Sequence, residues 1–231
     1  MTTGFCLAAA LFLLREPLRP RWMIASLLCF LLALYAKVSA APFAAFAALV
    51  LFFVHRLPAR KAAARSAPFF LLAAGYLVHR HLVMGQTHQV PPLSGSYGQT
   101  LFDMLAVIPL YARLVLGIPP FRIDYSYLPG GLTLRSPDAL AGLLIGAAFL
   151  ALTVAALRSR AFRRAGLGAA WFVLFLLPVS NLVPMMQYAA ERFLYLPLAG
   201  LIPAAVLLLV RQPLRRAHLA AILGIVAVAW G

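Results

Sequence analysis

Long apolar runs separated by short clusters of basic residues are the feature that most constrains how this chain folds. Hydrophobic residues make up 64% of the 231 residues, and charged residues make up only 11%. A water-soluble domain of this size needs more polar side chains to cover its surface. We therefore predict an all-α integral membrane protein, a polytopic transmembrane helical bundle of about eight passes in contact with the lipid bilayer.

The longest apolar run, residues 22–54, is broken only by Lys37. As one helix it would extend about 50 Å, well beyond a hydrocarbon core of about 30 Å. It would also leave Lys37 in mid-membrane. We predict two passes with a turn near Lys37, and Pro42 in the first turn of the second helix. Further passes are predicted at residues 3–14, 67–84, 139–157, 167–183, 193–210 and 219–230.

Four basic clusters lie between the apolar runs and indicate the topology. They are Arg15, Arg19 and Arg21; Arg56, Arg60, Lys61 and Arg65; Arg158, Arg160, Arg163 and Arg164; and Arg211, Arg215 and Arg216. Cytoplasmic loops carry an excess of Lys and Arg, so all four should lie on that side. All four clusters lie on the cytoplasmic side only if the apolar run at residues 101–117, which contains Asp103, Pro109 and Arg113, does not cross the membrane. We predict an interfacial or re-entrant helix there.

The net charge of +15 would suggest a nucleic-acid partner in a soluble protein. Here the basic residues border apolar runs, so we expect no nucleic acid as a partner. Cys6, Cys29 and the five histidines show no metal-ligand spacing, and nucleotide-binding, zinc-protease and serine-hydrolase motifs are missing from the sequence. We expect no metal and no cofactor.

The few charged residues on the predicted outer face are candidates for a site. Glu191 and Arg192 open a pass, and neighbours on a helix diverge by about 100°, so each should meet another partner. Arg192 suits a phosphate or a carboxylate, and Lys37 is a second isolated cation on that face. The two cations suggest an anionic lipid-linked ligand such as a polyprenyl phosphate. Ordinary snorkelling to the interface is the alternative.

Asp124 lies in the segment FRIDYSYLP, between Arg122 and Tyr125. It is either part of a polar cleft or a turn residue in an interfacial aromatic belt. The other acids have simpler interpretations. Asp138 is expected to be a first-turn acid that the helix dipole favours, and Glu16 a charge partner of the cytoplasmic arginines.

Three stretches resemble the membrane region of the transmembrane and tetratricopeptide-repeat O-mannosyltransferase-like proteins and their bacterial relatives. They are LLALYAKVSAAPF, YARLVLGIPPFRIDYSY and FLLPVSNLVPMMQYAAERFLYLPLAG, in the order and approximate spacing of that family, and they cover most of residues 25–205. The resemblance implies a GT-C type glycosyltransferase fold. Such enzymes take a sugar from a polyprenyl-phosphate donor on the outer face and pass it to a hydroxyl of a protein or glycan acceptor.

The resemblance also implies roles for the outer-face residues. Arg192 and Lys37 would contact the donor phosphate, and Tyr125 would lie in the substrate-binding site. Asp124 and Glu191 would shape the polar site and are the candidate catalytic residues. General-base chemistry needs such a carboxylate to take the proton from the acceptor hydroxyl.

The chain departs from the family pattern in two ways. Val38 follows Lys37 where family members usually have Glu, and the family's first outer loop, with its catalytic acids, should precede Met1. We therefore expect residues 1–231 to be a single transmembrane domain, a fragment of a multi-pass protein of a bacterial inner membrane, without its N-terminal passes and C-terminal repeats. A non-catalytic membrane anchor or assembly protein of a tetratricopeptide-repeat protein is the alternative, and a transporter is a third.

Overall fold

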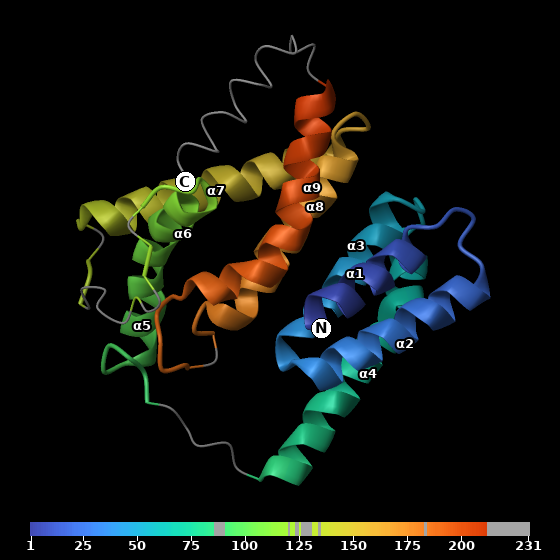
Figure 1. Cartoon of the computed structure of the whole chain (residues 1–231), viewed down its shortest axis with the longest axis horizontal. Helices are drawn as coiled ribbons and strands as arrows, with labels where there is room; N and C mark the ends of the chain where they lie inside the picture. The colour runs from blue at the N-terminus through green and yellow to red at the C-terminus, as the bar shows by residue number, and fades with distance from the viewer. Residues whose placement is uncertain are drawn as a thin grey trace.

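The computed structural model describes residues 1–85, 91–119, 121, 122, 125, 131–133, 135–182 and 184–211 (Figure 1). Throughout this part of the chain every regular element is a helix and no strand occurs. The prediction of an all-helical chain is therefore confirmed. The predicted last pass, residues 219–230, and two arginines of the last basic cluster, Arg215 and Arg216, lie outside the described residues.

Four helices in the N-terminal part pack against one another (Figure 1). They are α1 (Thr2–Leu13), α2 (Pro20–Ala36), α3 (Phe43–Phe53) and α4 (Ala59–Met84), with the short 3-10 helix η1 (Val38–Ala40) between α2 and α3. The predicted break at Lys37 is confirmed, because Lys37 ends α2 in an extended backbone conformation. Pro42 directly precedes α3, where its missing N–H costs no hydrogen bond.

The helix predicted at residues 67–84 begins eight residues earlier, at Ala59. Pro58 precedes it, and alanine and basic residues, which have high helix propensity, fill its first turns. The prediction covered only the apolar part of α4 because apolar length is the signal for membrane crossing. Arg60 and Arg65 therefore lie on the exposed surface of a helix rather than in a loop.

The run at residues 101–117 folds into α5 (Tyr97–Asp103), the 3-10 helix η2 (Met104–Ala106) and α6 (Val107–Val115). Ser96 caps α5, because its hydroxyl accepts a hydrogen bond from the N–H of Gln99 at 3.2 Å. Both α-helical parts are shorter than the roughly 20 residues that a spanning helix needs. The next helix, α7 (Pro137–Arg158), packs on η2 through Gly142, where a Cβ would collide with the backbone of Leu105.

Two helical segments are long and apolar enough to cross a membrane: Pro137–Arg158, which is α7, and Glu191–Val210. The second comprises the 3-10 helix η4 (Glu191–Leu194) and most of α9 (Tyr195–Arg211). Leu144 and Leu152 on α7 are each 69% exposed, and contiguous exposed apolar surface of this kind is typical of a helix that faces lipid or a partner. The described residues thus contain two candidate spans, and the other predicted passes are shorter helices or combine charged and apolar turns.

The pass predicted at residues 167–183 is shorter and is displaced toward the N-terminus. The helix α8 (Arg163–Leu176) begins in the basic cluster, and the 3-10 helix η3 (Leu177–Val179) follows it. Pro178 prevents continuation as an α-helix, because its ring replaces the N–H that would bond to the preceding turn. α8 packs closely on α9 because glycines meet there: a Cβ on Gly200 would lie 2.5 Å from the ring of Trp171.

Two hydrophobic clusters form the interior. The larger one joins the N-terminal helices to α8, and its rings include Phe30, Phe43, Phe46, Phe69, Trp171 and Phe175. The smaller one lies between α6, η4 and the loop that precedes η4, and contains Met104, Tyr111, Tyr125, Tyr188 and Leu194. This smaller cluster supports two groups of polar side chains.

Candidate functional site

Polar and charged side chains gather at two ends of the helical assembly. At the first, which we call the basic end, Arg56, Arg160, Arg163 and Arg164 border a groove together with Glu16 and His55. These residues come from three of the predicted cytoplasmic loops. α8 runs away from the basic end and α9 returns toward it (Figure 1), so Glu191 at the start of η4 lies at the other end, which we call the polar end.

Asp103, at the C-terminus of α5, is the most completely hydrogen-bonded acid in the described residues. Its side chain accepts bonds from Ser94 Oγ at 2.5 Å and Gln99 Nε2 at 2.7 Å. It also accepts bonds from the backbone N–H groups of Gly131 at 3.1 Å and Leu132 at 2.9 Å. The residue is 1% exposed. It therefore fastens the segment around residue 131 and the segment around Ser94 to α5.

The hydrogen bonds decide the charge of Asp103. Burial alone would raise the pKa of its carboxyl group, but the bonds from Ser94, Gln99, Leu132 and Gly131 outweigh burial and lower the pKa below its usual value. The carboxylate is thus ionised at neutral pH. A carboxylate with a lowered pKa and four donors is a weak general base, so Asp103 acts here as a structural anion.

Ser94 links Asp103 to the loop that precedes η4. Its hydroxyl donates to Asp103, and the hydroxyl of Tyr188 lies 2.5 Å from the same Oγ atom. A hydroxyl has one proton, so Ser94 accepts the bond from Tyr188 while it donates to the carboxylate. Tyr188 is 5% exposed and packs in the smaller hydrophobic cluster.

Glu191 is the second acid at the polar end, and it opens the candidate span Glu191–Val210. Its Oε1 atom accepts hydrogen bonds from the hydroxyl of Tyr125 at 2.9 Å and from the N–H of Arg122 at 2.8 Å. The structure therefore brings Glu191 and Tyr125 together, although 65 residues separate them in the chain. Oε2 of Glu191 accepts no hydrogen bond from the described residues.

Tyr125 is buried near a partly buried cation, Arg113. Burial is the main cause that raises the pKa of its hydroxyl, and the carboxylate of Glu191 contributes in the same direction. Arg113 on α6 is close enough to lower that pKa in part. Nε of Arg113 is buried and makes no hydrogen bond with the described residues. The guanidinium of Arg113 thus places a positive charge near Tyr125.

The remaining predicted site residues have separate positions. Arg192 is exposed, and its Nη2 donates to Gln187 Oε1 at 2.5 Å while its guanidinium lies 5.5 Å from the ring centre of Phe193. Glu191 and Arg192 do not pair with each other but bond to other residues, as predicted. Lys37 is exposed and makes no side-chain hydrogen bond with the described residues, and no contact brings it to Glu191. Asp124 lies outside the described residues.

Asn181 shapes the loop that carries Tyr188 to the site. It is fully buried and adopts a left-handed backbone conformation with φ 53°. Its Nδ2 donates to the carbonyl oxygen of Gln187 at 3.1 Å, and its Oδ1 accepts from the N–H of Met185 at 2.9 Å. Asparagine tolerates this conformation better than most residues, because its short side chain bonds to the local backbone.

No protein-family model, curated protein or solved structure matches this chain. The chemistry that the site can perform is therefore inferred from its own residues. They provide an exposed arginine, a half-buried arginine and a half-buried carboxylate with one oxygen that accepts no hydrogen bond from the described residues, next to a helix that is apolar enough to cross a membrane. In the described residues, no group of three or more His, Cys, Asp or Glu side chains is arranged to hold a metal ion.

The sequence interpretation missed Asp103 and Asn181. Asp103 counted only as an obstacle to membrane crossing, yet a lone acid within an apolar run is itself a signal of a functional or structural site. Asn181 could not be identified from the sequence, because asparagine is common in turns and loops of every kind.

Proposed function

We propose that the chain is the membrane part of a glycosyltransferase that moves a sugar from a polyprenyl-phosphate donor to an acceptor hydroxyl on the outer face of a membrane. The proposal includes a GT-C type bundle of about eight passes in a bacterial inner membrane, with the basic end in the cytoplasm. The gathering of arginines from two basic clusters around one groove supports this orientation.

The observation that carries the proposal is the attachment of Glu191 to Tyr125 and Arg122 at the first turn of a candidate span. This position puts a carboxylate and several cations where the head group of a membrane lipid would lie. Arg192 is exposed and its fork of N–H donors suits a phosphate. Arg113, whose Nε atom is buried, adds a positive charge that would stabilise negative charge developing on the leaving phosphate.

The proposed reaction needs one proton transfer and one displacement. Oε2 of Glu191 takes the proton from the acceptor hydroxyl, and the acceptor oxygen forms a bond to the anomeric carbon of the sugar. The bond from that carbon to the phosphate oxygen breaks, and polyprenyl phosphate leaves with its electron pair. Asp103 is excluded as the base by its lowered pKa and its four hydrogen bonds, so it positions the loops instead.

A non-catalytic anchor or assembly protein is the second candidate, and one observation favours it. Both acids at the polar end accept hydrogen bonds that hold loops in place, so each has a sufficient structural role. In that case Glu191 serves only to join the segment at Tyr125 to the start of η4.

Transfer assays on the intact protein in proteoliposomes distinguish the two candidates. A panel of short-chain polyprenyl-phosphate hexoses serves as donor, and release of polyprenyl phosphate is measured. We expect release to fall at least 100-fold in Arg192→Ala and Glu191→Gln, a loss typical of removing a group that stabilises the transition state. Arg135→Ala is the matched control, because Arg135 is an exposed arginine without a described partner.

The outcomes separate the roles clearly. Unchanged release in Arg192→Ala would reject its contact with the donor phosphate. If the parent protein released polyprenyl phosphate from no member of the panel, the anchor function would replace the enzyme.

A further inference from the structure

The groove at the basic end combines apolar walls with arginines that form no ion pair with a described carboxylate. It has a volume of about 1060 Å³ and lies between α1, α3, α8 and α9. Typical small-molecule pockets measure about 300–1,000 Å³, so the groove has room for a long ligand. None of its lining residues belongs to the hydrogen-bonded groups around Asp103 and Glu191 at the polar end.

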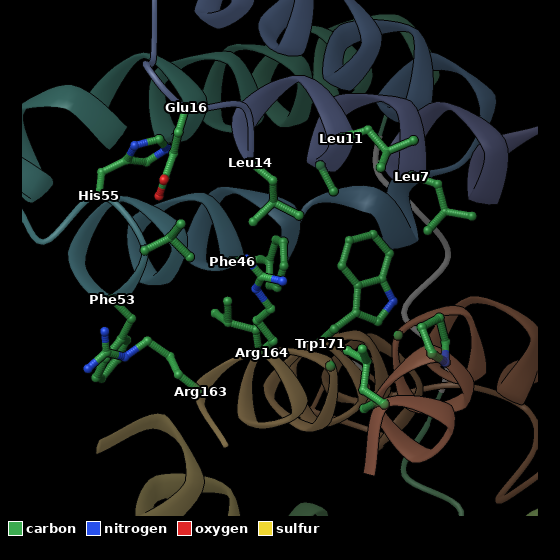
Figure 2. A pocket seen from close by; sticks show the side chains of 18 of the residues that line it. Leu7, Leu11, Leu14, Glu16, Phe46, Phe53, His55, Arg163, Arg164 and Trp171 are labelled. Carbon is green, nitrogen blue, oxygen red and sulfur yellow. The ribbon is translucent and has the colours of Figure 1, made fainter. Parts of the chain in front are cut away.

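The two halves of the groove differ in chemistry. Figure 2 shows Leu7, Leu11 and Trp171 at one end, and Glu16, His55 and Arg163 at the other. Further apolar side chains from α1, α3 and α9 continue the walls, among them Leu14, Phe46, Pro203, Ala204 and Leu207. The groove is therefore amphipathic along its length, with apolar side chains toward one end and charged side chains toward the other, which we call its mouth.

The arginines at the mouth have no counter-ions in the described residues. Arg56, Arg160 and Arg164 are exposed and form no ion pair with a described carboxylate. Arg163 is held toward the groove by a hydrogen bond from its Nε to the carbonyl oxygen of Leu157 at 3.3 Å. Glu16 is the single described acid in the lining, so positive charge remains in excess.

The side chain of His55 is bonded within the protein, because its Nε2 donates a hydrogen bond to the carbonyl oxygen of Leu13 at 2.8 Å. Arg56, its neighbour, has a left-handed backbone with φ 51°, which is uncommon for a residue with a side chain. The chain between α3 and α4 thus turns sharply and brings Arg56 to the groove, next to the arginines that open α8.

We propose that this groove binds an anionic phospholipid of the cytoplasmic leaflet. The lipid phosphate lies among Arg56, Arg160, Arg163 and Arg164, and an acyl chain lies along Leu7, Leu11, Trp171 and Leu207. Guanidinium groups bind phosphate oxygens in a bidentate manner, and basic pockets between membrane helices on this side suit anionic head groups. Charge complementarity selects an anionic lipid over a zwitterionic one, and the apolar interior selects a lipid over a free anion.

Trp171 provides a reporter inside the groove. In a Trp22→Phe, Trp230→Phe background it is the remaining tryptophan of the three. The intact protein is placed in nanodiscs that contain phosphatidylcholine and phosphatidylglycerol, with bromine on the acyl chains of one lipid at a time. Bromine quenches indole fluorescence only at short range. We therefore expect brominated phosphatidylglycerol to quench Trp171 more strongly than brominated phosphatidylcholine at the same mole fraction.

The matched variants remove equal charge at the same end of the molecule. Arg163→Gln with Arg164→Gln should lower the preference for phosphatidylglycerol about 30-fold, as expected from the contribution of two arginines near an anionic lipid. Arg60→Gln with Arg65→Gln, two exposed arginines on α4 that do not line the groove, should leave it unchanged. Arg163→Lys with Arg164→Lys should retain most of the preference and shows that the protein folds.

Three results would overturn the proposal. Equal quenching by the two lipids would show that the groove does not select an anionic head group. An equal loss in the α4 control would show that general surface charge is responsible. Abolition of the preference by inorganic phosphate, but not by chloride at the same ionic strength, would show a site for free anions instead of a lipid.

Discussion

The basic end and the polar end both combine charged side chains with apolar surroundings, but they do so in opposite ways. At the polar end, Asp103 and Glu191 are carboxylates bonded by donors from distant segments. At the basic end, the arginines that line the groove form no ion pair with a described carboxylate. A charged side chain that is hydrogen-bonded within the protein stabilises the fold, whereas a charged side chain without an ionic partner beside a cavity is available to a ligand.

Asp103 serves internal positioning, whereas the exposed arginines at both ends are available for external contacts. Arg192 belongs to the second kind even though it lies at the polar end, because its one described hydrogen-bonding partner is the amide oxygen of Gln187. Substitutions at the two ends should therefore differ in kind. A change of Asp103 should affect stability, and changes of the exposed arginines should affect binding.

The largest expected effect comes from Asp103→Ala. It leaves four donors without their acceptor, including two backbone N–H groups, and should lower the free energy of unfolding by about 3–5 kcal/mol. The loss of stability is measured by unfolding in a mixed detergent titration. Hydrogen exchange at Gly131 and Leu132 measures the local part of the loss. Asp138→Ala, an exposed first-turn acid, should cost less than about 1 kcal/mol. Equal losses in the two variants would contradict the structural role of Asp103.

Gly200→Leu should have the next largest effect, and it should disturb both ends. The new side chain collides with Trp171 and separates α8 from α9, which should cost about 1–3 kcal/mol. Because α9 follows Glu191 and also lines the groove, both lipid selectivity and loop protection should decrease. Gly75→Ala on α4 is the control, since a Cβ there meets nothing within 4 Å and should stabilise the helix by up to about 1 kcal/mol.

Acid should loosen the polar end before the basic end. The pKa of Asp103 in the folded protein lies below that of an unfolded aspartate, which is about 3.9. Its contribution to stability is therefore complete above that value and is lost as the pH falls through the folded pKa. Hydrogen exchange at Leu132, corrected for intrinsic rates, should show this loss below about pH 4. Asp103→Asn should be less protected and nearly independent of pH, and an unchanged pH profile in that variant would exclude Asp103 as the cause.

The smallest expected effect is an increase in lipid selectivity at the basic end. Glu16 is the described acid that lines the groove, and its charge opposes a phosphate there. Glu16→Gln should raise the preference for phosphatidylglycerol by up to about fivefold, the contribution of one charge near an anionic lipid. The Trp171 quenching ratio measures it. A decrease in that preference would mean that Glu16 orients the arginines rather than repelling the lipid.

Several features could be predicted from sequence because they depend on short stretches of chain. The break at Lys37 follows from the length of one apolar run and one charge, and α2 does end there. The separate partners of Glu191 and Arg192 follow from the angle between neighbours on a helix. The beginnings of α4 and α8 were placed too late, because apolar length does not detect a helix that starts with basic residues.

The sequence by itself determined that the chain is helical, that much of its surface is apolar and that its basic residues border the ends of helices. The packing of the helices was needed to show that Asp103 bonds to Leu132, that Tyr125 bonds to Glu191 and that arginines of two basic clusters line one groove. Helix formation and hydropathy are local properties that residues within a few turns establish. Hydrogen bonds between segments 29 or 66 residues apart, and a cavity between four helices, depend on how those helices pack, which no short stretch of sequence specifies.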